Sequence, residues 1–287
     1  MNIQKNTVKK VFKGVFQGII TGDNKVFYIQ NCVIKDDILY GFSEALNESI
    51  ELEAKICKPI LTGKTINKYY IKNKNEYILY PYILENCKTR IIEESLLKSD
   101  YPKTYNYFTK LKKRLSSRGT EKMKYPCWYS LWNFRNILNL ECMRIVTPDI
   151  CYGTSMFFEN GSHYHNDTSY AFILDEPSEI KYKFYLAILN SPITWFYLKE
   201  TGTSLRGGYF RFKTKYLENF PLPTATESQQ QELANLATLM MEAVKKQQDA
   251  KSDQEKNICK MRVEAIDTQI NAKVYALYGL TEEEIAI

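Results

Sequence analysis

The chain has 287 residues, of which 44% are hydrophobic and 25% are charged, and its formal net charge is +6. This hydrophobic content is enough for a packed core and excludes a disordered chain, while the mild positive charge is compatible with an anionic partner without identifying one. The seven cysteines are odd in number and form no CxxC pair, which argues against a disulfide framework and a zinc ribbon.

The sequence also predicts where the protein resides. The first ten residues, MNIQKNTVKK, lack the apolar segment of a signal peptide. No run of about 18 apolar residues occurs, so we expect no segment that spans a membrane. We therefore expect a cytoplasmic protein with reduced thiols and no membrane partner.

Residues 1–223 have the pattern of a mixed, strand-rich α+β domain. Short β-prone runs are separated by turn signals such as Gly22-Asp23-Asn24 and Asn160-Gly161. The predicted strands are Lys25–Gln30, Tyr77–Tyr82, Arg144–Thr147 and Tyr170–Leu174. The predicted helices are Glu85–Asp100, Tyr101–Arg118 and Tyr182–Leu198, the last with a break near Ser191-Pro192.

The pattern changes after Phe220-Pro221-Leu222-Pro223, and residues 224–287 are predicted to be a helical region. Thr224 and Glu227 have the spacing of a capping box. Apolar residues then recur at helical spacing on two stretches, Leu233, Leu236, Met240 and Val244 on the first and Ile266, Ile270, Val274 and Leu277 on the second. With Gly279 as a helix end, residues 224–279 are predicted to form a helical hairpin. Its apolar stripe packs against the chain's own body or serves a partner domain.

Motifs for catalysis and for cofactor binding are missing. No GxGxxG follows a predicted strand, and no GxxxxGK[ST] phosphate loop occurs. Asn190-Ser191-Pro192-Ile193 is the nearest string to the Pro-Pro-Tyr tetrapeptide of adenine methyltransferases, but it lacks the second proline and the aromatic residue that stacks on a flipped base. We therefore expect no catalytic residue, no cofactor-binding residue and no metal ligand in this chain.

Two weaker patterns compete with that expectation. Pro148-Asp149 followed by Glu179-Ile180-Lys181 resembles a PD…ExK nuclease signature, in which two carboxylates bind Mg²⁺. His163 and His165, with Cys151 and Asp167 nearby, suggest a metal site, but their spacing matches no closed zinc motif. A solvated helix start and loop histidines are the simpler interpretations.

Six segments, in chain order, resemble the TaqI-like C-terminal specificity domain of adenine-specific DNA methyltransferases and fused type IIG restriction-modification enzymes. They are Gly18–Ile29 (GIITGDNKVFYI), Lys58–Tyr69 (KPILTGKTINKY), Tyr77–Tyr82 (YILYPY), Cys127–Asn139 (CWYSLWNFRNILN), Arg144–Ile150 (RIVTPDI) and Leu189–Pro223. Thr65 stands where the family usually has an aspartate. The ending Tyr275–Glu284 (YALYGLTEEE) is also similar, so the resemblance covers nearly the whole chain.

The resemblance implies a DNA target-recognition domain at 1–223 followed by a helical hairpin region at 224–287. It implies sequence-specific recognition of double-stranded DNA, as the specificity part of an adenine-N6 methyltransferase or type IIG enzyme. It also implies that a methyltransferase domain precedes the specificity domain. We therefore expect the partner to be a methyltransferase or nuclease domain or subunit, which would bring S-adenosylmethionine and any Mg²⁺ that it requires.

Basic residues in the predicted loops are the candidates for DNA contact, since loops on a rigid scaffold often carry binding residues. Gly207-Gly208 would let backbone N–H groups approach phosphates, and Arg206 and Arg211 suit bidentate contacts with phosphate or guanine. For Arg135, which lies between two aromatic stretches, the alternative to DNA contact is a structural role as a packed, hydrogen-bonded arginine. The candidate DNA-binding residues are Thr21, Lys64, Lys68, Arg114, Arg118, Arg135, Arg206, Arg211, Lys213 and Lys215.

Two alternative functions remain open at this point. A half specificity subunit of a type I restriction system also has a recognition domain followed by a "PLP" string and a glutamine-rich helix, which Phe220–Glu232 resembles. A stand-alone metal-dependent nuclease rests on Asp149, Glu179 and Lys181 alone.

Overall fold

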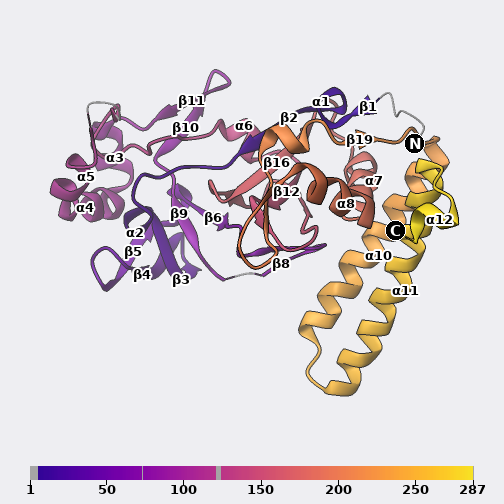
Figure 1. The fold of residues 1–287 in the computed structure, drawn as a ribbon. Coiled ribbons are helices and arrows are strands. Elements are labelled where there is room, and N and C mark those ends of the chain that lie inside the picture. Colours follow the sequence, from indigo (N-terminus) through magenta and orange to yellow (C-terminus); the bar gives the residue numbers. More distant parts are fainter. Residues whose placement is uncertain (1–5, 73, 121–123, 287) are drawn as a thin grey trace.

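The computed structural model describes residues 6–72, 74–120 and 124–286. The fold is α+β, as predicted, with an outer lobe, a central sheet and a helical hairpin arranged along one long axis (Figure 1). No helix in these described ranges is long and apolar enough to cross a membrane.

The outer lobe is built on a six-stranded sheet with the order β15-β6-β9-β3-β4-β5. Its strands are β3 (Tyr28–Lys35), β4 (Ile38–Ser43), β5 (Glu48–Glu53), β6 (Cys57–Leu61), β9 (Tyr77–Leu79) and β15 (Tyr164–His165). Helices α3 (Glu94–Asp100), α4 (Pro102–Lys110) and α5 (Lys112–Ser116) supply Leu97, Phe108 and Leu115 to its core. This core is a separate hydrophobic cluster from that of the central body.

The central body contains a four-stranded sheet with the order β14-β12-β16-β2. Its strands are β2 (Phe12–Gln17), β12 (Arg144–Pro148), β14 (Phe157–Glu159) and β16 (Ser169–Leu174). Strand β16 pairs antiparallel with both β12 and β2, so the chain leaves the body after β2, builds most of the outer lobe and returns at β12. Helices α7 (Glu179–Leu189) and α8 (Pro192–Thr201) contribute side chains to the same hydrophobic cluster as this sheet. The helical segment breaks after α7 and starts again at Ser191-Pro192, as predicted.

Shorter elements connect these parts. On the outer lobe they are α2 (Asn24–Phe27), η1 (Ala54–Ile56), β10 (Tyr82–Glu85), β11 (Lys88–Ile91) and α6 (Ile137–Leu140). On the body they are β1 (Asn6–Thr7), α1 (Val8–Val11), β7 (Ile66–Asn67), β8 (Tyr70–Ile71), β13 (Ile150–Cys151), β17 (Thr203–Ser204), β18 (Phe210–Arg211), α9 (Thr214–Leu217), β19 (Pro221–Leu222) and α12 (Glu282–Ile285).

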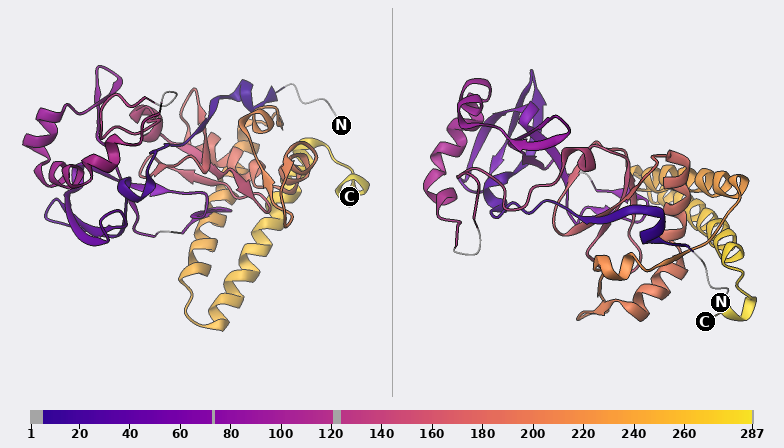
Figure 2. Two further views of the ribbon diagram at one scale, coloured as in Figure 1. Left: turned by 60° about the vertical axis from the view of Figure 1, so that its left-hand side comes forward. Right: turned by 90° about the horizontal axis from the view of Figure 1, so that it is seen from above.

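The predicted helical hairpin is present as α10 (Glu227–Asp249) and α11 (Asp253–Tyr278). Leu233, Met240, Ile270 and Val274 of its stripe belong to the same cluster as the sheet residue Phe172, which confirms packing against the chain's own body. Beyond that contact the two helices extend away from the body, and their connection lies at the free end (Figures 1 and 2).

Three local predictions are wrong. Residues 85–93 are predicted helical but belong to the β10–β11 hairpin and the segment after it, and helix begins only at Glu94. Residues 25–27 are predicted to start a strand but form the helical turn α2. The capping box of α10 uses Thr226 and Gln229 instead of Thr224 and Glu227, since Thr226 is the last extended residue before the helix.

Candidate nucleic-acid interface

A small three-stranded sheet, with the order β13-β18-β17, presents one side to solvent. Arg211 of β18 lies between Ile150 and Thr203, its neighbours on the two adjacent strands. Side chains alternate along a strand, so Tyr209 and Arg211 point one way while Phe210 and Phe212 point the other. Phe210 and Phe212 pack on Trp195 of α8, with ring centroids 5.4 and 6.1 Å apart. The body therefore supports the inner side of this sheet.

The outer side combines exposed aromatic rings with a cation, and we call it the tyrosine–arginine face, defined as Ile150, Tyr152, Tyr209 and Arg211. Tyr152 is 71% exposed and Tyr209 48% exposed, and their ring centroids lie 5.8 Å apart. Aromatic rings gathered on a surface beside an arginine are typical of an interface, since they would otherwise remain in unfavourable contact with water.

The β17–β18 turn carries Arg206 next to this face. Gly207 and Gly208 both have positive φ angles, 82° and 78°, and Leu205 N donates to Tyr209 O at 2.7 Å, which closes the turn. A Cβ atom on Gly208 would lie only 3.0 Å from Tyr152 Cε2, so a side chain there would disturb the tyrosine. Arg206 is exposed and forms no ion pair with any residue that the structure describes.

Lys213 and Lys215 are two further cations, and they follow β18 in the sequence. Lys213 is exposed and immediately precedes α9. Lys215 lies 4.7 Å from the centroid of the Tyr216 ring, a cation–π contact. Its ammonium group therefore has a local partner, whereas that of Lys213 is open to solvent.

An ion pair and two hydrogen bonds connect Arg211 to the turn that carries Lys64. Arg211 Nε lies 3.8 Å from Asp149 Oδ2, which is an ion pair and not a hydrogen bond. Asp149 N donates to Thr168 O at 2.9 Å, and Gly63 N donates to Thr168 Oγ1 at 2.8 Å. Lys64, which is exposed and next to Gly63, is thereby connected to Asp149 through Thr168.

Arg135 lies on the segment that joins the outer lobe to the body. Its Nε donates to Gln17 O at 2.5 Å, while Gln17 Nε2 donates to Asp167 O at 2.9 Å. Burial lowers the pKa of the Arg135 guanidinium, although the group remains charged at any physiological pH. The exposed residues Trp132 and Phe134 precede it in the sequence. Arg135 thus makes a hydrogen bond to the backbone of Gln17, and it also belongs to a segment with exposed aromatic residues.

Thr21, Arg114 and Arg118 are engaged within the outer lobe. Thr21 is buried, and its hydroxyl donates to Asn24 Oδ1 at 2.6 Å. Arg114 makes a bidentate pair with Asp23, at 2.6 and 2.9 Å. Arg118 donates to four backbone carbonyls, those of Leu115, Thr21, Trp128 and Ser130. These three side chains shape the loops around residue 21.

Lys68 is used to join two parts of the protein. Its Nζ lies 2.7 Å from Asp267 Oδ1 on α11, and both side chains are about one-third exposed. The structure therefore gathers Arg206, Arg211 and Lys213 around one small sheet, with Lys64 linked to it, and gives Lys68, Arg114, Arg118 and Thr21 contacts of their own.

Sequence reasoning missed Tyr152 and Tyr209. Both flank glycines, Tyr152 before Gly153 and Tyr209 after Gly208, and Gly153 has a φ of 98°. A large aromatic residue next to a glycine in a turn is a signal of exposure that could have been used. In a chain with 22 tyrosines, most of them suited to packing, that signal is easily lost.

The residues of the nuclease-like pattern take part in separate contacts. Asp149 faces Arg211, Glu179 pairs with Lys183, and Lys181 faces Glu176. No group of three or more His, Cys, Asp or Glu side chains suited to a metal ion occurs in the described ranges. This arrangement does not favour the nuclease alternative.

The two histidines likewise have structural partners. His163 Nδ1 lies 2.9 Å from Glu159 Oε2, and Glu159 Oε1 also accepts backbone N–H groups of residues 161–163. His165 is fully buried, with Nδ1 3.1 Å from Ser169 Oγ, and burial lowers its pKa well below 6.5.

Neither of the two segments nearest to cofactor-binding motifs fits S-adenosylmethionine. Asn190, in the string nearest to a methyltransferase tetrapeptide, is buried, and its amide exchanges two hydrogen bonds of 2.9 Å with the backbone of Met156. Gly207-Gly208 lies between two antiparallel strands, whereas a nucleotide-type loop joins a strand to a helix. We derive no methyl-transfer step from this chain.

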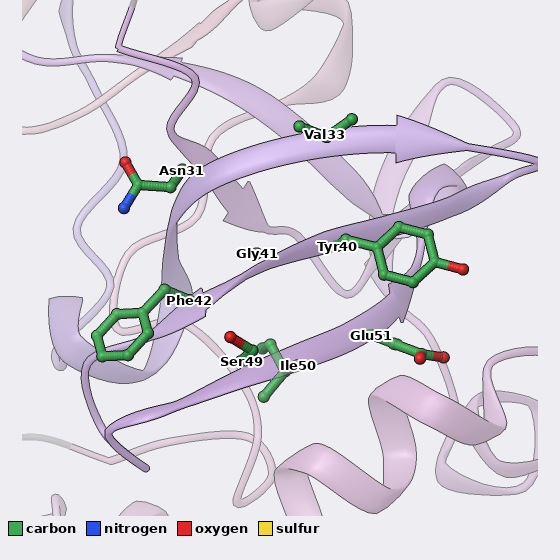
Figure 3. Close-up of a pocket in the computed structure, with 8 residues that line it drawn as sticks. All are labelled: Asn31, Val33, Tyr40, Gly41, Phe42, Ser49, Ile50 and Glu51. Atoms are coloured by element: carbon green, nitrogen blue, oxygen red, sulfur yellow. The ribbon is translucent and has the colours of Figure 1, made fainter.

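A surface cavity of about 460 Å³ lies away from the basic residues on the open side of β3, β4 and β5 (Figure 3). Val33, Tyr40 and Phe42 line it together with Ser49 and Glu51. Glu51 already accepts from Lys103 at 2.6 Å. The cavity has none of the candidate DNA-binding residues in its lining.

Comparison with known proteins identifies the class to which this chain belongs. The TaqI-like C-terminal specificity domain matches residues 58–222, more than half of the chain. The chain therefore belongs to the TaqI-like C-terminal specificity domain family, and the resemblance seen in the sequence motifs is confirmed.

Three curated relatives are restriction-modification proteins. The chain is 26% identical over 221 residues to the type II methyltransferase M.MjaIV of Methanocaldococcus jannaschii, covering 76% of this chain and 67% of the relative. It is 21% identical to the type II restriction enzyme and methyltransferase RM.Eco57I of Escherichia coli, covering 93% of this chain and 28% of the relative. It is also 21% identical to the type II methyltransferase M.PaeR7I of Pseudomonas aeruginosa, with 83% and 36% covered.

A solved structure shares the fold. The type IIL restriction-modification enzyme MmeI, described in complex with DNA, superposes with a TM-score of 0.65 at 13% identity. The match covers 98% of this chain and 35% of that enzyme. The chain thus corresponds in extent to about a third of the larger relatives, and it is a specificity domain of the kind found in type II methyltransferases and restriction-modification enzymes.

Proposed function

We propose that this chain binds double-stranded DNA through the tyrosine–arginine face and its neighbouring cations, and that it supplies sequence specificity to an adenine-N6 methyltransferase or a type IIG restriction-modification enzyme. The observation that carries the proposal is the β13–β18–β17 sheet, where exposed tyrosines and arginines lie together. Membership of the specificity-domain family supports it. We place this activity in the cytoplasm.

The chemistry of the face suits a nucleic-acid duplex. Arg206 and Arg211 can each donate two parallel hydrogen bonds to a phosphate or to guanine, and the tyrosines can contact sugars while their hydroxyl groups bond to phosphate. Phe210 and Phe212 hold the strand from the other side, so its backbone loses little conformational entropy when the outer side chains bind. A strand that is held in place by packing presents its outer side chains in a fixed geometry, which favours sequence-specific contacts with DNA.

The remaining candidates divide into two roles. Lys64, Lys213 and Lys215 lie where they can neutralise phosphates beside the face. Thr21, Arg114, Arg118 and Arg135 position the outer lobe and its loops, so that exposed Trp132 and Phe134 are held near the duplex. Lys68 steadies the β7–β8 hairpin against α11.

Methyl transfer or cleavage belongs, in this proposal, to a methyltransferase or nuclease domain or subunit that binds S-adenosylmethionine and any required Mg²⁺. The residues described here would orient the duplex for that partner. A catalytic partner also closes around the other side of the DNA, so we expect this chain alone to bind more weakly than the usual specific range of about 10⁻⁸ M or tighter.

Fluorescence anisotropy with a labelled random duplex at several salt concentrations tests DNA binding by the purified chain. Neutralising about 4–6 phosphates gives a slope of log K against log salt of roughly −4 to −5. Arg206→Ala should weaken binding to all duplexes and reduce the slope by about 1 if it contacts phosphate.

Lys110→Ala is the matched control, because Lys110 pairs with Glu48 on the far edge of the outer lobe and should leave binding unchanged. Absence of binding at low salt, or binding that does not respond to salt, contradicts the proposal. An equal loss from Arg206→Ala and Lys110→Ala shows that the contact is not localised at the tyrosine–arginine face.

A further inference from the structure

Two arginine–aspartate pairs in this protein differ in how completely they use their hydrogen-bonding groups. Arg114 and Asp23 form a closed pair, with two short bonds of 2.6 and 2.9 Å. Arg211 Nε and Asp149 Oδ2 are 3.8 Å apart, which is too long for a hydrogen bond. The Arg211–Asp149 pair is therefore open: the two groups attract each other, but their donors and acceptors remain available to a ligand.

The position of Asp149 is fixed by its backbone. Its N–H donates to Thr168 O at 2.9 Å, and its carbonyl accepts from Phe212 N at 2.8 Å. The carboxylate is thereby held between β13 and the segment after β18, beside Arg211. Its side chain is 20% exposed and that of Arg211 is 44% exposed, so both can be reached from the tyrosine–arginine face.

The Asp149 carboxylate makes no short bond to a cation among the residues that the structure describes. Burial raises its pKa, the Arg211 charge lowers it, the nearby Asp167 raises it, and the backbone N–H groups of Asp149 and Ile150 lower it again. A partly dehydrated carboxylate without a short bond to a cation is stabilised by further N–H donors. It also repels phosphate oxygens, which makes it unsuited to the nonspecific contacts that suit a lysine.

Base edges offer the complementary groups. In the major groove cytosine presents its N4 amino group as a donor, and guanine presents O6 and N7 as acceptors. A carboxylate beside a guanidinium matches these two edges of a single base pair. A phosphate matches only the guanidinium.

We propose that Asp149 and Arg211 together read one C·G base pair, with the Asp149 carboxylate accepting from cytosine N4 and the Arg211 guanidinium donating to guanine O6 and N7. This inference rests on the proposed function, and it assigns to the tyrosine–arginine face a particular substrate feature. Asp149 is then a specificity-determining acidic residue beside a face made of apolar, aromatic and cationic side chains.

The test is selection from a randomised duplex pool, with the full chain used at low salt and the bound fraction sequenced. The wild-type chain should enrich a motif that contains at least one C·G pair. Asp149→Asn and Arg211→Ala should each remove the preference at that same position while preferences elsewhere persist. The loss of discrimination at that position should be about 5- to 150-fold.

Glu48→Gln and Lys110→Ala are matched controls, since they make the same kinds of change in an ion pair at the far edge of the lobe. They should leave the motif intact. Thermal unfolding of each variant identifies loss of folding, and Asp149→Asn preserves the shape of the side chain, so it tests the readout where Arg211→Ala unfolds.

The outcomes separate the two proposals. If the wild-type chain enriches a motif, and Asp149→Asn leaves every position of that motif unchanged, the inference is overturned while DNA recognition stands. If Asp149→Asn and Arg211→Ala affect different positions, joint reading of one pair is overturned. If the wild-type chain binds no duplex or enriches no motif, the proposed function and the inference fail together.

Discussion

Lys68 and Asp267 join segments that are 199 positions apart in the sequence, through a 2.7 Å contact between the β7–β8 hairpin and helix α11. Both side chains are about one-third exposed, so solvent screens the pair and its contribution to stability is small, about 0.2–1 kcal/mol. We expect Lys68→Met and Asp267→Asn to lower the free energy of unfolding by no more than this. Denaturant titration checks the value, and a loss above about 2 kcal/mol would mean that the pair is far less screened than its exposure indicates.

Arg118 and Arg206 are expected to respond differently to replacement by alanine. Arg118 satisfies four backbone carbonyls, so Arg118→Ala should lower the free energy of unfolding by about 3 kcal/mol or more. Arg206, exposed on a turn, should change it by less than about 0.5 kcal/mol. Chemical denaturation of both variants tests this contrast. Similar losses in the two would show that exposure and bonding do not separate their roles.

Gly18 is expected to tolerate no side chain. An added Cβ would lie 2.2 Å from Asn166 O and 2.4 Å from His165 O, both rigid backbone atoms. Gly18→Ala must therefore displace the segment that bridges Ile19 to Asn166, at a cost of about 1–3 kcal/mol or more. Gly153→Ala, where nothing lies within 4 Å, is the comparison for an uncrowded glycine with positive φ. Equal melting temperatures for Gly18→Ala and the wild type would refute the argument.

Removal of residues 224–287 should prevent the body from folding as a soluble unit. The deletion strips Leu233, Met240, Ile270 and Val274 from the cluster that also contains Phe172 and Leu186. Apolar surface of that extent becomes a site of aggregation. Expression of residues 1–223, followed by size-exclusion chromatography and circular dichroism, tests this. A monomeric fragment with a cooperative melting transition would contradict it.

His165 makes stability depend on pH. Burial lowers its folded-state pKa well below 6.5, so the unfolded chain takes up a proton that the folded chain does not. Stability from this group is fully present above pH 6.5 and is lost as the pH falls toward the folded-state pKa, at about 1.4 kcal/mol per pH unit. Unfolding free energies measured from pH 7.5 to 5 should show this slope, and His165→Gln should reduce it. An unchanged slope in the variant would assign the effect to other groups.

Long periodic segments could be predicted from sequence because their pattern and their packing agree. The stripe of α10 and α11 is regular over several turns, and Ser191-Pro192 marks the restart of α8 correctly. Residues 85–93 were predicted wrongly because Asn86 and Cys87, both with positive φ, form a hairpin turn that helical composition hides. The pairing of β10 with β11, and not the local composition, determines the structure of that segment.

The candidate site could be predicted only in part, for a related reason. Arg206, Arg211 and Gly207-Gly208 lie in one sequence segment, so their proximity follows from the chain itself. Asp149 and Tyr152 come from another strand, and only the pairing of Ile150 with Arg211 brings them to the same face. No spacing in the sequence encodes that register.

The path of the chain through the central sheet has a consequence for how such a protein can vary. Strands β2 and β12, where the chain leaves for the outer lobe and returns from it, both flank β16, so the two points lie within about 15 Å of each other. Most of the outer lobe is thus an insertion between neighbouring strands, with a hydrophobic cluster of its own. Insertions and deletions in the lobe can accumulate without shifting the register of the central sheet. The lobe is therefore the part of the molecule that evolution or domain grafting can replace most easily.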